Sequence, residues 1–296
     1  MKLINRIQMK DLSKSFGKTQ ALQGVDWNLK PGMAVGLIGR NASGKSTLLQ
    51  CAAGLLLPTS GTCETLGVDA GHLGEEQLCR IGYVGQTVSL LGWLSVEQHI
   101  RYVASFQPNW DKDLEKDLRD DFDIPAKKRV QTLSQGMQRR LALLLALCHH
   151  PDLLLLDEPF SDLDPISRRD SMARIMDRLI NDGTSVVVSS HVLHDIEKVV
   201  DHVLCLSEGS IVHESNLDAL KERYGEWIVQ EGARKCPTHF SEDFVLSCEA
   251  NGPQARLAID LQNADLAAFQ DRHGVQVVSR SLNFEEIFPL IAGSGA

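Results

Sequence analysis

Short apolar runs alternate with longer, more mixed segments over the first two thirds of the chain. AVGLI at Ala34–Ile38, LLLL at Leu153–Leu156 and the VVV within TSVVVSSH at 184–191 each fit a strand buried on both faces of a parallel sheet. After the first run, TLLQCAAGLLL is expected to continue as a helix until Pro58 stops it. This alternation predicts an α/β fold built on an open parallel sheet.

The pattern changes towards the C-terminus. A hairpin-like LCLSEGSIVHES and a helical LDALKERY are followed by short alternating stretches around one helical piece, ADLAAFQDRHG. We therefore expect a first domain over 1–222 and a small α+β appendage over 223–296. The appendage carries no catalytic constellation, because its Cys236, Cys248 and His273 lack the spacing of metal ligands.

Composition narrows the class of protein. The 296 residues are 43% hydrophobic and 23% charged, as in ordinary globular proteins. A net charge of −9 argues against a nucleic-acid partner, because a surface that tracks phosphates needs an excess of Lys and Arg. Seven scattered cysteines without a C-x-x-C pair suggest neither a zinc site nor a disulfide framework, and they fit a reducing cytoplasm. The longest apolar run, LALLLAL, is far below the roughly 20 residues that a membrane-spanning helix needs.

The stretch GRNASGKST follows the first apolar run directly. It fits G-x-x-x-x-G-K-[ST] with Gly39, Gly44, Lys45 and Ser46 in register, and a strand before it and a helix after it are the expected context. Such a loop turns its amides towards phosphates, Lys45 reaches the outer phosphates, and the Ser46 hydroxyl can bind magnesium. We therefore predict a nucleoside triphosphate site. Its loop residues are Gly39, Arg40, Asn41, Ala42, Ser43, Gly44, Lys45, Ser46 and Thr47.

Polar side chains follow the other two apolar runs. Asp157 and Glu158 end the second run, and His191 ends the third. Ligands of open parallel sheets lie beyond the carboxyl ends of the strands, so these side chains should emerge beside the glycine loop. Asp157 is expected to support the magnesium ion, Glu158 to polarise the attacking water, and His191 to approach the γ-phosphate. The simpler alternatives are an acidic pair that only ends a strand and an ordinary surface or core histidine.

The segment LSQGMQRRLALLLAL makes the chemistry more specific. Together with the glycine loop and the polar strand ends, it resembles the ATP-binding subunits of ABC transporters, and this resemblance covers about the first 220 residues. The family's signature is LSGGQ; this chain keeps Leu133, Ser134 and Gly136 but has Gln135 and Met137 at the third and fifth places. A capped amphipathic helix is the simpler alternative for this segment.

The resemblance assigns further residues. Phe16 matches the aromatic residue that stacks on adenine, with a buried core residue as the alternative. Gln86 matches the glutamine between magnesium and the membrane subunit, or is only an exposed polar residue after a strand. Asp164 matches the loop that crosses the dimer interface, although it could simply cap the helix that begins at Pro165. Trp93 lies where the membrane subunit docks, with core packing as the alternative.

The resemblance also implies an architecture. The fold would be a P-loop NTPase whose core carries an inserted helical subdomain at about 87–150, where the charged run DKDLEKDLRDDF is expected to be a solvated helix face. The cofactors would be ATP and Mg²⁺, with Ser46, Gln86 and Asp157 on the metal. The pairing of FQPNWD with the signature helix is similar to one branch of the family, the bacterial single-domain subunits of the YtrB type.

The resemblance implies partners as well. One chain holds one glycine loop and one signature, so ATP would be held in a head-to-tail dimer, between Lys45 and Ser46 of one chain and Ser134, Gln135 and Gly136 of the other. The second subunit could be identical or different. The ATPase would drive a separate transmembrane subunit from the inner face of the cell membrane. The alternatives are a soluble ABC-type ATPase that remodels a non-membrane complex, and a regulatory nucleotide-binding module with negligible hydrolysis.

Overall fold

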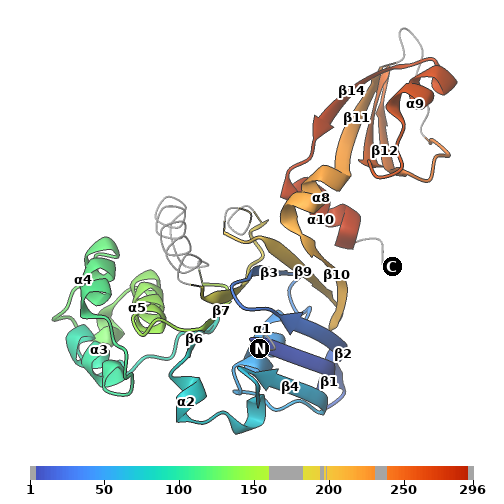
Figure 1. The fold of residues 1–296 in the computed structure, drawn as a ribbon. Coiled ribbons are helices and arrows are strands. Elements are labelled where there is room, and N and C mark those ends of the chain that lie inside the picture. The colour runs from blue at the N-terminus through green and yellow to red at the C-terminus, as the bar shows by residue number, and fades with distance from the viewer. Residues whose placement is uncertain (1–4, 160–182, 194–196, 198, 231–238, 293–296) are drawn as a thin grey trace. The chain divides into compact units, whose positions relative to one another are not determined.

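The structure, a computed structural model, describes residues 5–159, 183–193, 197, 199–230 and 239–292. The chain divides into two compact units, 1–214 and 215–296 (Figure 1). This division falls a few residues before the boundary that we placed after residue 222. Within the described residues, the first unit has two sheets and the second has one, and each unit has its own hydrophobic core.

The first unit contains a six-stranded sheet in the order β10-β9-β3-β8-β7-β6. Its strands are β3 (Ala34–Ile38), β6 (Ile81–Val84), β7 (Leu153–Asp157), β8 (Ser185–Ser189), β9 (His202–Ser207) and β10 (Ser210–Asn216). The pairs β6-β7, β7-β8, β8-β3 and β3-β9 are all parallel. Every residue of β3, β7 and β8 is buried, which confirms the prediction of strands covered on both faces.

A four-stranded antiparallel sheet packs with this parallel sheet. Its order is β2-β1-β4-β5, with β1 (Ile7–Phe16), β2 (Thr19–Leu29), β4 (Ser60–Thr65) and β5 (Val68–Asp69). Helix α1 (Lys45–Ala52) joins the same core, in which Met9 and Trp27 of the antiparallel sheet meet Leu48 of the helix and Leu155 of β7. This shared core holds the start of α1, and therefore the end of the glycine loop, against the parallel sheet.

Helix α1 is shorter than predicted. We expected it to continue to Pro58, but it ends at Ala52. The reason is Gly54, which adopts a left-handed φ of +71° and donates its N–H to the carbonyl of Cys51 at 3.1 Å. A Cβ at this position would lie 2.4 Å from the carbonyl oxygen of Ala70. The chain therefore leaves the helix at Gly54, four residues before Pro58, so the proline does not end the helix.

Three helices form the predicted helical stretch between β6 and β7, namely α3 (Val96–Ala104), α4 (Lys112–Asp121) and α5 (Gln135–Leu147). The short helices of the first unit are η1 (Ala70–His72) and α2 (Glu75–Leu78) before β6, and η2 (Val130–Thr132) between α4 and α5. Helix α4 buries only Leu114 and Leu118, so the charged run is a solvated face, as predicted. Within the ranges described above, no helix combines the length and apolar character needed to cross a bilayer.

The second unit is a small α+β domain (Figure 1). Its elements are α8 (Leu217–Arg223), β11 (Tyr224–Gln230), β12 (Val245–Asn251), β13 (Gln254–Asp260), α9 (Leu266–His273), β14 (Gln276–Ser281) and α10 (Phe284–Ala292). The sheet order is β12-β13-β11-β14, and each neighbouring pair is antiparallel. Trp227, Leu257 and Phe269 lie in its core, where the Trp227 and Phe269 rings are 5.2 Å apart between centroids. These elements match the predicted appendage.

An ion-pair network joins α10 to the sheet of this second unit. Arg280 of β14 donates to Glu226 of β11 at 2.6 Å and to Glu286 of α10 at 2.7 Å. The hydrogen bonds from Arg280 lower the pKa of Glu286 below its usual range. Both carboxylates in turn raise the pKa of Arg280, which therefore stays charged at any ordinary pH.

Candidate functional site

The glycine loop lies between β3 and α1, and its shape depends on two glycines. A Cβ on Gly39 would lie 2.3 Å from the carbonyl oxygen of Leu206. Gly44 has a φ of +108°, and a Cβ there would lie 2.5 Å from the carbonyl oxygen of Ala21. Only glycine fits either place without moving the backbone. Strand, loop and helix therefore follow one another as the phosphate-binding motif requires.

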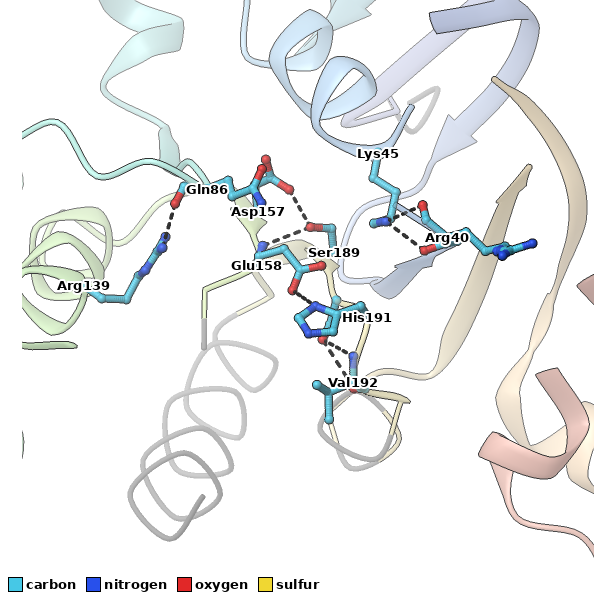
Figure 2. Close-up of polar contacts among 11 residues, drawn as sticks. Arg40, Lys45, Gln86, Arg139, Asp157, Glu158, Ser189, His191 and Val192 are labelled. Carbon is cyan, nitrogen blue, oxygen red and sulfur yellow. Dashed lines mark hydrogen bonds and ion pairs between the residues drawn. The ribbon is translucent and has the colours of Figure 1, made fainter. Parts of the chain in front are cut away.

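Lys45 begins α1 and places its ammonium group inside the loop (Figure 2). Its Nζ donates to the carbonyl oxygens of Gly39 at 2.8 Å and Arg40 at 3.1 Å. Burial lowers the pKa of Lys45, whereas the negative charges of Glu158 and Asp157 raise it. Lys45 thus interacts electrostatically with both acidic side chains. The structure brings together the glycine loop and the acidic strand end, as predicted from the sequence.

Asp157 is the last residue of β7 and is only 1% exposed. In the parallel pairing of β7 with β8 it lies opposite Ser189. The Ser189 hydroxyl donates to Asp157 Oδ1 at 2.6 Å. The other oxygen, Oδ2, is buried and has no hydrogen-bond partner among the residues that the structure describes. One carboxylate oxygen is therefore held, and the second is left for a ligand.

Glu158 follows in a left-handed backbone conformation with a φ of +49°, which is uncommon for a residue other than glycine. Its N–H donates to two oxygens of Ser189, the hydroxyl at 3.0 Å and the backbone carbonyl at 3.2 Å. Its Oε2 lies 2.7 Å from Nδ1 of His191, a hydrogen bond in which the protonated ring nitrogen donates (Figure 2). The His191 side chain is half exposed, whereas that of Glu158 is almost buried. The acid and the histidine predicted from two separate strand ends thus meet in one contact.

The residues present fit a magnesium ion. The buried Oδ2 of Asp157, which has no hydrogen-bond partner among the described residues, is a hard oxygen donor of the kind that magnesium or its bound water takes. Among the described residues, no group of three His, Cys, Asp or Glu side chains could hold a metal alone. Magnesium does not need such a cage, because one or two protein oxygens, substrate phosphates and waters complete its shell. The hydroxyl of Ser46 and the amide of Gln86 are the other predicted donors.

Sequence reasoning missed two residues of this site, Ser189 and Arg139. Arg139 lies in α5, is 3% exposed, and donates to the carbonyl oxygen of Gly85 at 2.7 Å and to that of Gln86 at 2.6 Å. Figure 2 shows the bond to Gln86. It ties the backbone at Gln86 to the helix that begins with the signature. An arginine within the Leu-rich face of a helix was a visible signal, because a buried guanidinium needs acceptors. Ser189 carried no such signal within its apolar run.

The signature residues lie at the start of α5. Ser134 caps this helix, since its hydroxyl accepts the N–H of Met137 at 3.3 Å, and Gln135 and Gly136 are the first two helical residues. The helix-capping alternative is thus correct as a local role. No hydrogen bond of the described residues joins Ser134, Gln135 or Gly136 to the glycine loop of the same chain. Their contact with the nucleotide of a second chain stays a prediction.

The remaining predicted residues have different outcomes. Phe16 is 51% exposed, with Lys14 Nζ 5.2 Å from its ring centroid, so the core alternative for it is wrong. Trp93 is 68% exposed, so core packing is wrong there too. Gln86 is exposed after β6, which fits the alternative of an exposed polar residue, and its role on magnesium stays a prediction. Asp164 lies outside the described residues. Adenine stacking and membrane-subunit docking stay predictions.

Comparison with known proteins agrees with this geometry. The family model described as "ABC transporter" matches residues 22–161. The chain is 32% identical to the bacitracin transport ATP-binding protein BcrA of Bacillus licheniformis, over 75% of this chain and 73% of that protein. It is 31% identical to the ABC transporter ATP-binding protein YtrB of Bacillus subtilis, over 74% of each. A solved dimeric bacterial ABC transporter cassette has the same fold, with a TM-score of 0.64 and 24% identity over 71% of this chain and 98% of that one. At such identity over most of the length of these relatives, the chain belongs to the ABC transporter ATP-binding proteins, and it is an ATPase of that family.

Proposed function

We propose that this ATPase works as a head-to-tail dimer and drives a separate transmembrane subunit of a transporter. The observation that carries the catalytic part is the placement of the buried acidic strand end beside the glycine loop (Figure 2), where the negative charges of Asp157 and Glu158 raise the pKa of Lys45 against the effect of burial. A triphosphate held by the loop would have its outer phosphate next to these carboxylates. Catalysis here consists of positioning and of charge stabilisation.

Each side chain has a separate task in this proposal. Magnesium, when bound, neutralises the charge that develops on the phosphates. Ser46 and Asp157 would hold it, with Gln86 from the loop after β6. Glu158 orients the attacking water, and His191, which donates a hydrogen bond to Glu158, reaches the γ-phosphate. Phe16 is exposed and therefore available to stack on adenine.

The dimer is supported by the chain's having one glycine loop and one signature segment, the two halves of the proposed ATP site. The signature begins α5 with Ser134 exposed, and the N-terminus of a helix favours an anion. A second chain whose glycine loop faces this helix end completes two sites at once. The similar solved cassette is a dimer, which supports the pairing of two chains.

The membrane partner is supported by the relatives and by an exposed surface. Both named relatives are ATP-binding proteins of transport systems. Trp93 exposes most of its side chain within a few residues of Gln86, and large exposed aromatics are typical of protein-protein interfaces. We therefore place the contact with the transmembrane subunit around these two residues. The chain would then lie on the inner face of the cell membrane, held there by its partner.

The catalytic assignment is tested with Glu158→Gln. The amide keeps the shape of the side chain but cannot accept a proton from water, so ATP binding should persist while turnover is lost and ATP-bound dimers accumulate. The matched control is Glu75→Gln on the exposed surface of α2, which should behave as wild type. Binding is measured by calorimetric titration, and dimers by light scattering with ATP and Mg²⁺. Wild-type turnover in Glu158→Gln would refute the role.

The partner is tested by purification from native membranes. The chain carries an N-terminal tag, membranes are dissolved in mild detergent, and co-purifying proteins are identified. A polytopic membrane protein in stoichiometric amount is expected. Trp93→Ser should reduce its recovery, whereas Leu55→Ser, an equally exposed apolar residue after α1, should not. Recovery only from the soluble fraction, with a ribosome or scaffold protein attached, would contradict the transporter proposal.

A further inference from the structure

We propose that Ser189 is a positioning residue of the ATPase site, whose hydroxyl orients Asp157 so that one carboxylate oxygen faces the metal. The proposal rests on the proposed function, in which Asp157 supports magnesium. Ser189 was not among the predicted residues, and it does not touch the nucleotide in this role. It acts through Asp157 and, to a smaller extent, through the backbone of Glu158.

Ser189 is placed by strand pairing. It is the last residue of β8 and lies directly opposite Asp157, the last residue of β7. It is completely buried, so water does not compete for its hydroxyl. The hydroxyl has one proton and it meets one acceptor, Asp157 Oδ1, and one donor, the N–H of Glu158. An N–H can only donate, so the proton of Ser189 must go to Asp157.

This proton decides the orientation of the carboxylate. A bond of 2.6 Å from a hydroxyl to an ionised carboxylate is in the strong, charge-assisted range. It holds Oδ1 and opposes rotation of the carboxylate about its Cβ–Cγ bond. The second oxygen, Oδ2, is buried and without a partner among the described residues. Its lone pairs are therefore available to a cation or to water bound to one.

The same hydroxyl matters less for Glu158. The N–H of Glu158 also reaches the carbonyl of Ser189 at 3.2 Å, a contact that any residue at this position would keep. The carboxylate of Glu158 is held separately, by His191 at 2.7 Å. Removing the Ser189 hydroxyl should therefore weaken the metal site first and leave the base nearly in place. This separates its effect from that of Glu158→Gln.

A purely structural hydroxyl is the competing explanation, and the chain offers a matched control for it. Ser185 lies in the same strand and is also completely buried. Its hydroxyl accepts the N–H of Gly32 at 2.8 Å and donates to the carbonyl of Lys30 at 3.2 Å. It thus makes the same kinds of bond at the other end of β8, away from the acidic pair. Ser185→Ala reports the cost of losing a buried hydroxyl without touching Asp157.

The test measures metal binding as well as turnover. Mn²⁺, which replaces magnesium and is visible by electron paramagnetic resonance, is titrated into the full chain with a non-hydrolysable ATP analogue. Ser189→Ala should raise the Kd for Mn²⁺ by about 10- to 100-fold, the usual effect of losing a group that orients a metal ligand. The Mg²⁺ concentration for half-maximal turnover should rise in parallel, with kcat at saturating Mg²⁺ close to wild type. Ser189→Thr, which restores the hydroxyl, should recover binding, and Ser185→Ala should leave the Kd unchanged.

The outcomes separate the two proposals. An unchanged Kd in Ser189→Ala, or an equal rise in Ser185→Ala, would overturn the positioning role while leaving the proposed function intact. Failure of the wild-type chain to bind Mn²⁺ with the nucleotide would instead overturn the proposed function. If Ser189→Ala does not fold, Ser189→Cys is measured in its place, because it fills the site with a much weaker donor and should show the same rise.

Discussion

Arg139 offers the sharpest prediction about how the Gln86 loop is held. Its guanidinium is 3% exposed and donates to the backbone carbonyls of Gly85 and Gln86. A hydrogen bond that involves a charged group contributes about 1.5–3 kcal/mol, so losing both should lower the free energy of unfolding by about 3–6 kcal/mol. The two carbonyls would also lose their partner, and the loop that carries Gln86 would be released from α5.

The assay compares Arg139→Ala with Arg140→Ala by urea unfolding and by amide hydrogen exchange around residues 85–86. Arg140 is the next residue of the same helix, but it is only half-buried and bonds to the carbonyl of Phe122 at 3.1 Å. Because it is less buried, its loss should cost less than that of Arg139 and leave exchange near Gln86 unchanged. Equal destabilisation by the two variants, or an unfolding free energy of Arg139→Ala within about 1 kcal/mol of wild type, would refute the reasoning.

Three further predictions concern the supporting structure. Gly54→Ala should destabilise the chain by about 1–3 kcal/mol in thermal unfolding, because a Cβ there would strain the left-handed backbone and also lie 2.4 Å from the Ala70 carbonyl oxygen. Gly17→Ala should cost less, because Gly17 is also left-handed but has open space around it. Trp227→Ala should cost about 3–5 kcal/mol and shift only the transition of the second unit in calorimetry, so a uniform shift of all transitions would contradict it. Because Arg280 holds the pKa of Glu286 below its usual 4.5, this ion pair stabilises the fold above that pH and the stabilisation is lost as pH falls through the lowered pKa. Unfolding of Glu286→Gln should therefore depend less steeply on acid pH, and an unchanged slope would exclude the pair as its source.

Much of the fold was readable from local patterns. The apolar runs at Ala34–Ile38 and Leu153–Leu156 became buried parallel strands, since burial on both faces requires apolar residues at every position. The glycine loop was readable because its function depends on backbone conformations that only a few residue types adopt. Asp157, Glu158 and His191 were readable from their place at strand ends, because parallel strands present these ends at one edge.

The tertiary structure decided what depends on residues far apart in the chain. Ser189 meets Asp157 across 32 positions, and Arg139 meets Gly85 across 54, through a strand register and a helix packing that no local pattern encodes. The end of α1 also depends on tertiary structure. Gly54, where the helix ends, lies against the backbone of Ala70 in η1, and the later proline does not end the helix. The sequence by itself thus determined which groups are predicted to do the chemistry, because their types and local spacing are chemical requirements. Only the folded chain determined which groups hold them in place, because a buried hydroxyl or guanidinium takes its role from the neighbours that packing provides.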